Sequence, residues 1–437
     1  MLTHRTATII GDIPPDWEPK PLRTLLKKQF SGDWGADEGE QAVSVLRSTN
    51  FTSSGALDFS DVATRYFTPD KAENFGLQSG DLLVERSGGG PDQPVGRIGF
   101  ITEVLPKATV SNFVQVLRPD ATKVDPEFLG WVLYELQRTG IIERVQQQST
   151  QMRNLNWRDY QRLLLPWPEQ NEQCRIAAAL KLADDAIVKA KAELEAAREL
   201  KRSLEMSLLN GSLDNQCREK KQTKAGKLPV NWNVEHLKRV ATIDSGVTLN
   251  QDRAPKENPC RYLTVAHVQR GAITAEDPRY LELSTVERET RILSDGDVLV
   301  VEGHANPLEI GRAGIFADIG EPTTFQNHLF RVRATPDKLL PKFLLHILNS
   351  VRMQKHWNAI CNTSSGLNTI NRRNLRNVLI QFPDIDEQRG ILDTLDASEA
   401  SVDACMKKVA ALEGIKKSLL QNLLTGKIRV PEGVIRG

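Results

Sequence analysis

The stretch KRSLEMSLLNGSL at residues 201–213 is written again as KKSLLQNLLTGKI at residues 416–428, an offset of 215 positions. Two further pairs of segments keep the same offset: GDIPPDW (11–17) with GKLPVNW (226–232), and PEQNEQCRI (168–176) with PDIDEQRGI (383–391). Landmarks that hold one offset across a chain indicate an internal repeat. We therefore expect two copies of one structural unit, each closing on the same kind of helix.

Each copy ends in a long helical pattern, in which apolar and small residues advance by alternating threes and fours. This is the heptad pattern of a helix that packs on another helix. The predicted seam positions are Ile176, Leu180, Ile187, Leu194, Leu204, Leu208, Ile391, Leu395, Val402, Val409, Leu419 and Leu423. About 39 residues at 1.5 Å each give a helix of about 58 Å, which is too long for the interior of a small domain.

We expect the two helices to pack on each other antiparallel, so that the halves are related by a pseudo-twofold; the alternative is that each packs on its own domain. Asn171 and Asp386 are the predicted N-caps, and Gly211 and Gly426 are the predicted helix ends.

The regions before the helices mix strand-like runs, such as DLLVER (81–86), with amphipathic helical runs, such as PEFLGWVLYELQ (126–137) and PKFLLHILNSVR (341–352). The predicted fold class is α/β (α+β mixed), with two pseudo-twofold-related globular domains joined by two long antiparallel coiled-coil helices. The expected boundaries are 1–167 for the first domain, 168–213 for the first helix, 214–225 for a polar linker, 226–382 for the second domain, 383–426 for the second helix and 427–437 for a C-terminal tail.

The composition is that of a soluble globular protein, with 437 residues, 40% hydrophobic and 26% charged. No apolar run of about 18 residues predicts a membrane span, and the first residues lack the features of a signal peptide. Five scattered cysteines argue against a disulfide framework or a zinc cluster and favour a reducing, cytoplasmic setting. The net charge of +1 neither requires nor excludes a nucleic-acid partner, because a reader of DNA needs only a local basic surface.

Polar loops rich in Gln, Asn, Ser, Thr and Arg interrupt both domains, and these are the side chains that hydrogen-bond base edges and phosphates. The candidate DNA contacts are Arg86, Arg97, Gln147, Ser149, Arg153, His304, Asn306, Arg312, Ser364, Asn368, Arg372 and Arg373. The alternatives are a solvated surface and, for the arginines, structural salt bridges.

Sequence motifs for catalysis are missing. There is no GxxxxGK[ST] phosphate loop and no [DN]PP[YF] methyltransferase motif. PDWEPK (15–20) resembles a nuclease site only weakly, since the repeat has VNWNVE (230–235) there and replaces Asp16, Glu18 and Lys20 with Asn231, Asn233 and Glu235. The seven histidines have no metal-ligand spacing. We expect no catalytic residue and no metal site in this chain.

The two copies together resemble the specificity subunit of type I restriction-modification systems. PDIDEQRGI (383–391) with LLTGKIRV (423–430) matches that family closely, and PEQNEQCRI with LLNGSL is the looser copy. The resemblance implies two target-recognition domains, each reading one half of a bipartite, asymmetric sequence in double-stranded DNA. It also implies that the helices set the spacer between the half-sites and dock two methyltransferase (modification) subunits.

The resemblance further implies that restriction/translocase subunits are partners and that the chain is cytoplasmic in a prokaryote. S-adenosylmethionine for N6-adenine methylation, and ATP and Mg for cleavage, would sit on partner chains, with no cofactor bound here. Three alternatives stay open: a symmetric protein scaffold without DNA readout, the specificity chain of a methylation-only system, and a fused methyltransferase or nuclease fragment. The departure GSLDN for GKIRV leaves open whether both helix ends dock partners equally.

Overall fold

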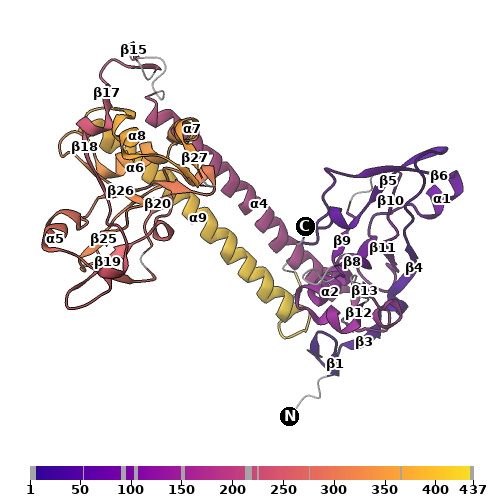
Figure 1. Cartoon of the computed structure of the whole chain (residues 1–437). Helices are drawn as coiled ribbons and strands as arrows, with labels where there is room; N and C mark the ends of the chain where they lie inside the picture. Colours follow the sequence, from indigo (N-terminus) through magenta and orange to yellow (C-terminus); the bar gives the residue numbers. More distant parts are fainter. Residues whose placement is uncertain are drawn as a thin grey trace. The chain divides into compact units, whose positions relative to one another are not determined.

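The computed structural model describes residues 6–52, 54–89, 95–102, 107–148, 153–211, 219–223, 226–274, 276–364 and 367–433. The contacts divide the chain into two units (Figure 1). The first unit is Met1–Lys191 with Lys407–Gly437, and the second is Ala192–Met406. Each unit therefore takes one globular domain from its own half of the sequence and a helical segment from each half.

The core of the first unit is a four-stranded antiparallel sheet covered by a helix. Its strands are β4 (Leu26–Ser31), β7 (Leu82–Glu85), β9 (Ile98–Phe100) and β11 (Val114–Pro119), in the order β4-β11-β7-β9. Helix α2 (Pro126–Arg138) begins at the Asp125 cap and buries its apolar face in the same core as Leu82, Val84 and Ile98. A second sheet contains β5 (Gln41–Leu46), β6 (Ala63–Phe67) and β10 (Ala108–Val110), in the order β10-β5-β6.

The second unit repeats this plan. Its main sheet contains β18 (Ala241–Ser245), β20 (Gly271–Ala272), β22 (Val298–Val301), β24 (Ala313–Ile315) and β26 (Leu329–Ala334), in the order β18-β26-β22-β24-β20. The second sheet contains β19 (Pro259–Leu263), β21 (Arg279–Glu282) and β25 (Thr323–Phe325), in the order β21-β19-β25. The mixed α/β fold predicted from the sequence is confirmed.

One helix of the second unit differs from the prediction. The sequence predicts one helical run at 341–352, but the helix is interrupted at Ser350, which separates α6 (Pro341–Asn349) from α7 (Val351–Ile360). The hydroxyl of Ser350 accepts a hydrogen bond from the Met353 N–H at 3.3 Å and caps the new helix. Serine competes well for backbone donors at such positions, which explains why the helix restarts there.

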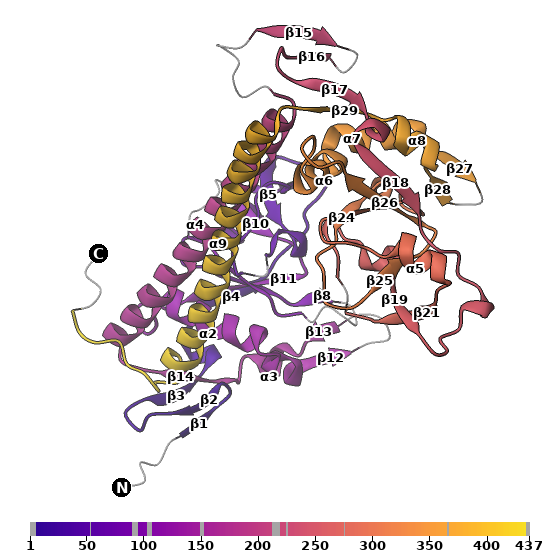
Figure 2. The same ribbon diagram turned by 90° about the vertical axis from the view of Figure 1, so that its left-hand side faces the viewer.

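The long helices are α4 (Gln170–Leu209) and α9 (Ile385–Leu423), and they pack antiparallel within each unit (Figures 1 and 2). In the first unit Lys191 pairs with Glu413 at 2.8 Å, and Asp184 pairs with Lys416 further along α9. In the second unit Lys201 pairs with Glu399. As residue numbers rise on one helix, they fall on the other.

Most predicted seam positions are buried, and the pattern shifts at the helix ends. The buried members are Ile176, Leu180, Ile187, Leu194, Ile391, Leu395, Val402, Val409 and Leu423. Leu204, Leu208 and Leu419 are only partly buried. Their neighbours Leu209, Leu420 and Leu424 are buried instead, because the last turn of each helix packs into a globular core rather than along the other helix.

The repeated Glu-Gln pair explains how each helix begins. Glu172 accepts a hydrogen bond from the indole N–H of Trp17 at 3.1 Å, and Glu387 accepts one from Trp232 at 3.0 Å. The next residue, Gln173, is fully buried. Its side-chain Oε1 accepts a hydrogen bond from the Asp125 N–H, and its side-chain Nε2 donates one to the Pro168 carbonyl, both at 2.9 Å. The motif therefore ties the helix start to the tryptophan and to the start of α2.

The two long helices also end in the same way, at a glycine packed beside a proline. Gly211 and Gly426 both have φ of +62°, which a glycine adopts readily. A Cβ on Gly211 would lie 2.7 Å from Pro229, and one on Gly426 would lie 2.5 Å from Pro14. The C-terminal stops predicted from the sequence are confirmed.

The predicted N-caps Asn171 and Asp386 are wrong. Both residues lie inside the first turn, because α4 begins at Gln170 and α9 at Ile385. In the second copy the side chain of Asp384 accepts from the Glu387 N–H at 2.9 Å and has the expected capping role.

The first copy has GSLDN (211–215) where the second has GKIRV (426–430), and the structure shows what Arg429 of the second copy binds. In the first unit Arg429 donates to Asp16 at 2.9 Å and to Glu172 at 2.6 Å. Hydrogen bonding from Arg429 lowers the pKa of Asp16. In the second unit Asn231 stands at the position of Asp16 and donates to Glu387 at 2.9 Å. With a neutral amide in place of a second carboxylate, the second unit does not require the extra cation.

Candidate nucleic-acid interface

Three short strands bring polar loops of the first unit together (Figure 2). They are β8 (Ser87–Gly89), β12 (Gln146–Gln148) and β13 (Arg153–Leu155), in the order β12-β13-β8. Both pairings are antiparallel, and the register places Arg153 opposite Gly89 on one side and Gln148 on the other. Segments about 60 residues apart in the sequence thus form one small sheet, which we call the first polar sheet.

The second unit builds the same sheet from β23 (Gly303–His304), β27 (Asn362–Ser364) and β28 (Leu367–Thr369), in the order β23-β28-β27. In this second polar sheet Asn368 lies opposite His304 and Thr363. The three residues of this row lie 215 positions after Gly89, Arg153 and Gln148. The two polar sheets are therefore equivalent frames that carry different side chains at matched positions.

Among the residues that the structure describes, no carboxylate neutralises the charge of two predicted arginines of the first unit. Arg86 and Arg153 are half-buried and form no ion pair among the residues that the structure describes. The backbone of Arg86 is fixed, since its N–H donates to Phe113 at 2.8 Å and its carbonyl accepts from Leu155 at 2.9 Å. A fixed backbone beside a guanidinium that forms no ion pair in the described part of the chain is suited to binding an anion or a base edge.

Arg97 and Arg312 instead form hydrogen bonds inside their own units. Arg97 binds Glu85 through two hydrogen bonds of 2.7 and 2.9 Å and also donates to the carbonyls of Ser48 and Phe51. Hydrogen bonding to Glu85 raises the pKa of Arg97. The repeat-matched Arg312 donates to Glu309 at 2.8 Å and to the Val265 carbonyl at 3.1 Å. A DNA contact by either residue stays a prediction, and the observed bonds give each a role in holding its loop.

The loop after β23 is organised around His304. The Nδ1 atom of His304 accepts a hydrogen bond from the Asn306 N–H at 3.0 Å, so the ring presents Nε2 as its remaining nitrogen. Exposed Asn306 also caps a short turn, accepting from the Leu308 N–H at 3.0 Å. The Asn368 amide donates to the Ala305 carbonyl at 3.3 Å. His304, Asn306 and Asn368 are thus brought together, as their common loop-and-strand origin requires.

The remaining candidates are more scattered. Arg372 and Arg373 are exposed on α8 (Arg372–Asn377), where Arg372 donates to the Ile243 carbonyl at 2.9 Å and no ion pair of Arg373 occurs in the described part of the chain. Gln147 is exposed on β12. Ser149 lies outside the described residues, as does the side chain of Ser364.

The sequence prediction missed Asn154, which lies between Ser87 and Gln147 in the first polar sheet. Side chains alternate along a strand, so Asn154 and Gln147 face the side opposite to Arg153. Counting this alternation within the polar run would have identified Asn154 as the neighbour of Gln147.

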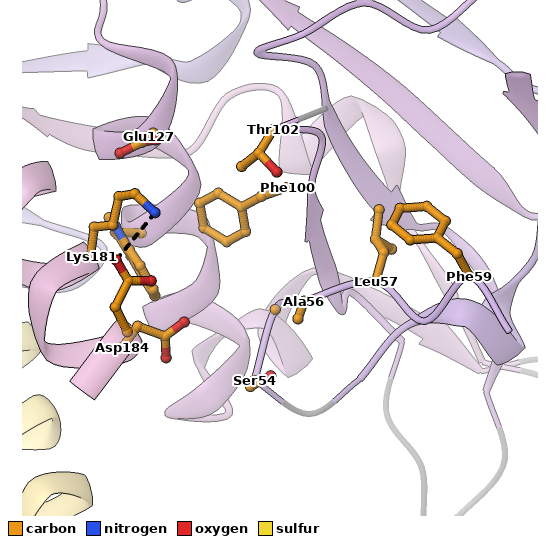
Figure 3. Close-up of a pocket in the computed structure, with 12 residues that line it drawn as sticks. Ser54, Ala56, Leu57, Phe59, Phe100, Thr102, Glu127, Lys181 and Asp184 are labelled. Atoms are coloured by element: carbon orange, nitrogen blue, oxygen red, sulfur yellow. Dashed lines mark ion pairs between the residues drawn. The ribbon is translucent and has the colours of Figure 1, made fainter. Parts of the chain in front are cut away.

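A cavity of about 220 Å³ in the first unit is an alternative candidate site (Figure 3). It is lined by Phe100, Trp131 and Glu127, and by Lys181, which pairs with Asp185 at 3.4 Å. Burial raises the pKa of Glu127. The cavity is smaller than the roughly 300–1,000 Å³ of typical small-molecule pockets, and its lining includes no cysteine or histidine.

Two other kinds of feature, a metal site and a membrane-spanning helix, are not found in the part of the chain that the structure describes. No group of three or more His, Cys, Asp or Glu side chains there is arranged to hold a metal ion. Among the same residues, no helix is long and apolar enough to cross a membrane.

Comparison with known proteins connects these features to a family. Residues 229–413 match the model of the type I restriction modification DNA specificity domain. The chain is 22% identical to the MjaVIII type I restriction enzyme specificity subunit of Methanocaldococcus jannaschii, over 96% of this chain and 94% of that protein. It is 20% identical to the EcoKI specificity subunit of Escherichia coli K12, over 96% and 90% of the two chains.

Solved structures share the fold. The crystal structure of the HsdS subunit from Thermoanaerobacter tengcongensis has a TM-score of 0.54 and 18% identity, covering 95% of this chain and 98% of that one. A structure reported for complex assembly and conformational transition of the type I R-M system has a TM-score of 0.60 and 17% identity, covering 95% and 99%.

Proposed function

We propose, because this chain belongs to the type I restriction-modification specificity subunits, that each of its two domains reads one half of a bipartite, asymmetric DNA target. The observation that carries the proposal is the pair of polar sheets, which place Arg153 and Asn368 at matched positions. Arginine pairs well with guanine and asparagine with adenine in the major groove. Equivalent frames with different side chains suit a target whose halves differ.

The two helices would set the spacer and dock two methyltransferase subunits. Two copies of one partner require two similar surfaces. Cavities of about 590 and 660 Å³ lie beside the helix starts, one in each unit, and are lined by repeat-matched residues. The matched pairs include Lys123 with Lys338 and Trp167 with Phe382. These cavities support duplicate docking.

Catalysis would then belong to the partner chains. S-adenosylmethionine for N6-adenine methylation would bind the methyltransferase subunits, and ATP and Mg would bind the restriction/translocase subunits. This chain would contribute recognition and spacing, which agrees with Arg86 and Arg153, whose guanidinium groups form no ion pair among the described residues.

The test is to combine the chain with its methyltransferase subunits and to map methylated sites on genomic DNA. We expect one bipartite motif, and DNA affinity that falls steeply as salt increases, because phosphate contacts release counterions. Binding without sequence preference or salt dependence would contradict the proposal and favour a scaffold that does not read DNA. Adding the restriction subunits then shows whether the system cleaves or only methylates.

A further inference from the structure

A cavity of about 410 Å³ in the second unit lies between the end of α4 and the start of α7. Its walls combine three cations, Arg202, Arg352 and Lys355, with the apolar side chains Met206, Leu209 and Val351. Two of these apolar side chains are exposed, at 45% for Met206 and 46% for Val351. Both views show α7 close to this end of α4 (Figures 1 and 2).

The charge of this cavity is not balanced. Within the described residues, Arg202, Arg352 and Lys355 form no ion pair, and the one carboxylate of the lining, Glu205, lies 3.6 Å from His346. Arg352 is partly buried, and this burial alone lowers its pKa. Desolvating a guanidinium without an acid is unfavourable, so an anion supplied from outside would stabilise it.

The matched positions of the first unit hold buried side chains. The counterparts of Ser350, Val351, Glu205 and Leu209 are Glu135, Leu136, Leu420 and Leu424. All four counterparts are buried, with Glu135 bound to Arg138 through two hydrogen bonds of 2.7 Å. Two differences open the space in the second unit: the helix breaks at Ser350, and Glu205 stands where the first unit has Leu420. The cavity is therefore not a by-product of the shared fold.

We propose that this cavity docks an acidic, partly apolar segment of one methyltransferase subunit. A carboxylate of that segment faces Arg352 and Arg202, and an apolar side chain covers Met206 and Val351. Arginine and methionine are enriched at protein interfaces, whereas a DNA phosphate would leave the apolar wall exposed. The inference rests on the proposed function, and it makes the two methyltransferase copies inequivalent, because only one copy meets this cavity.

The test measures binding of the methyltransferase subunit to the full-length chain by calorimetry at low and high salt. Arg352→Met keeps a side chain of similar length without the charge, and Arg202→Met removes a charge from the opposite wall. Lys256→Met is the matched control, since Lys256 is exposed in the same unit and outside the cavity lining. Thermal unfolding of each variant checks the fold.

We expect Arg352→Met to weaken one of the two binding steps about tenfold, or about 1.4 kcal/mol, and to reduce the salt dependence of that step. Arg202→Met should act on the same step, Arg352→Lys should restore part of the affinity, and Lys256→Met should bind as the unaltered chain does. Unchanged binding by both cavity variants would overturn the inference while leaving the proposed function intact.

Two other outcomes also contradict the inference. If methyltransferase binding is unchanged but DNA binding by the assembled complex weakens, the cavity belongs to the DNA surface. If the unaltered chain binds no methyltransferase subunit at all, the inference fails together with the proposed function.

Discussion

Replacing Gln173 or Gln388 by leucine should destabilise the protein by amounts that follow from the bonds lost. Leucine has about the volume of glutamine but no polar atoms. Gln173→Leu leaves the Asp125 N–H and the buried Pro168 carbonyl without their partners. A buried polar group left unpaired costs about 1–3 kcal/mol, so the expected loss is about 2–6 kcal/mol.

Gln388→Leu should cost slightly more. It removes the matching bonds to the Leu340 N–H and the Pro383 carbonyl, and a third bond to the Lys338 carbonyl at 2.9 Å. Because Lys338 is exposed, water can replace that third bond, which then contributes only about 1 kcal/mol. The free energy of unfolding should therefore fall in the order of unaltered chain, Gln173→Leu, Gln388→Leu.

The assay is urea denaturation of the full-length chain followed by tryptophan fluorescence, with Gln421→Leu, an exposed position on α9, as the control. Hydrogen exchange locates each effect, because exchange of the Asp125 amide should accelerate only in Gln173→Leu and that of Leu340 only in Gln388→Leu. The reasoning is refuted if both variants unfold within about 0.5 kcal/mol of the control, or if neither amide exchanges faster.

Arg153→Ala should weaken DNA binding by about 1–3 kcal/mol and relax the sequence preference at one position of the target. Arg97→Ala should mainly lower the melting temperature of the protein, because it breaks the bond to Glu85. Methylome mapping and calorimetry distinguish the two variants, and equal effects would contradict the assignment. Seven residues inserted into the seam of α4 should lengthen the target spacer by about three base pairs, since about 10.5 Å is added, and an unchanged spacer in a folded, assembled variant argues against the ruler. A fragment of residues 1–215 should dimerise at least about tenfold more weakly than the same fragment carrying Asp214→Arg, because Asp214 aligns in sequence with Arg429, which binds two carboxylates. Equal dimerisation of the two fragments in sedimentation would reject this prediction. The isolated chain should show no methylation and no cleavage, and measurable turnover with S-adenosylmethionine, or with Mg and ATP, would contradict it.

The sequence predicted those features that a periodic pattern encodes. The repeat offset paired Trp17 with Trp232 and Gly211 with Gly426. The members of each pair have the same local role in both copies, since the tryptophans bond the start of a long helix and the glycines end one. The break at Ser350 was not predicted, since the apolar pattern continues through it and only a side-chain cap marks the restart.

The candidate site was harder to predict for a physical reason. Basic residues in polar loops look alike in sequence, and only the tertiary structure shows which of them meets an acid. Arg97 meets Glu85 and Arg312 meets Glu309, whereas Arg86 and Arg153 meet no carboxylate in the described residues. The polar sheets themselves follow from strand pairings between segments far apart in the chain, which no local pattern encodes.

The packing of α9 against the first unit sets a schedule for biosynthesis. Leu420, Leu423 and Leu424 belong to the same core as Trp17 and Leu180. The two parts of that unit are separated by the whole of Ala192–Met406. At about 5–20 residues per second, a ribosome needs on the order of 10–40 s to make the intervening segment. During that interval the core of the first domain lacks these leucines on the nascent chain, so the first domain to be synthesised is completed only by the last helix to emerge.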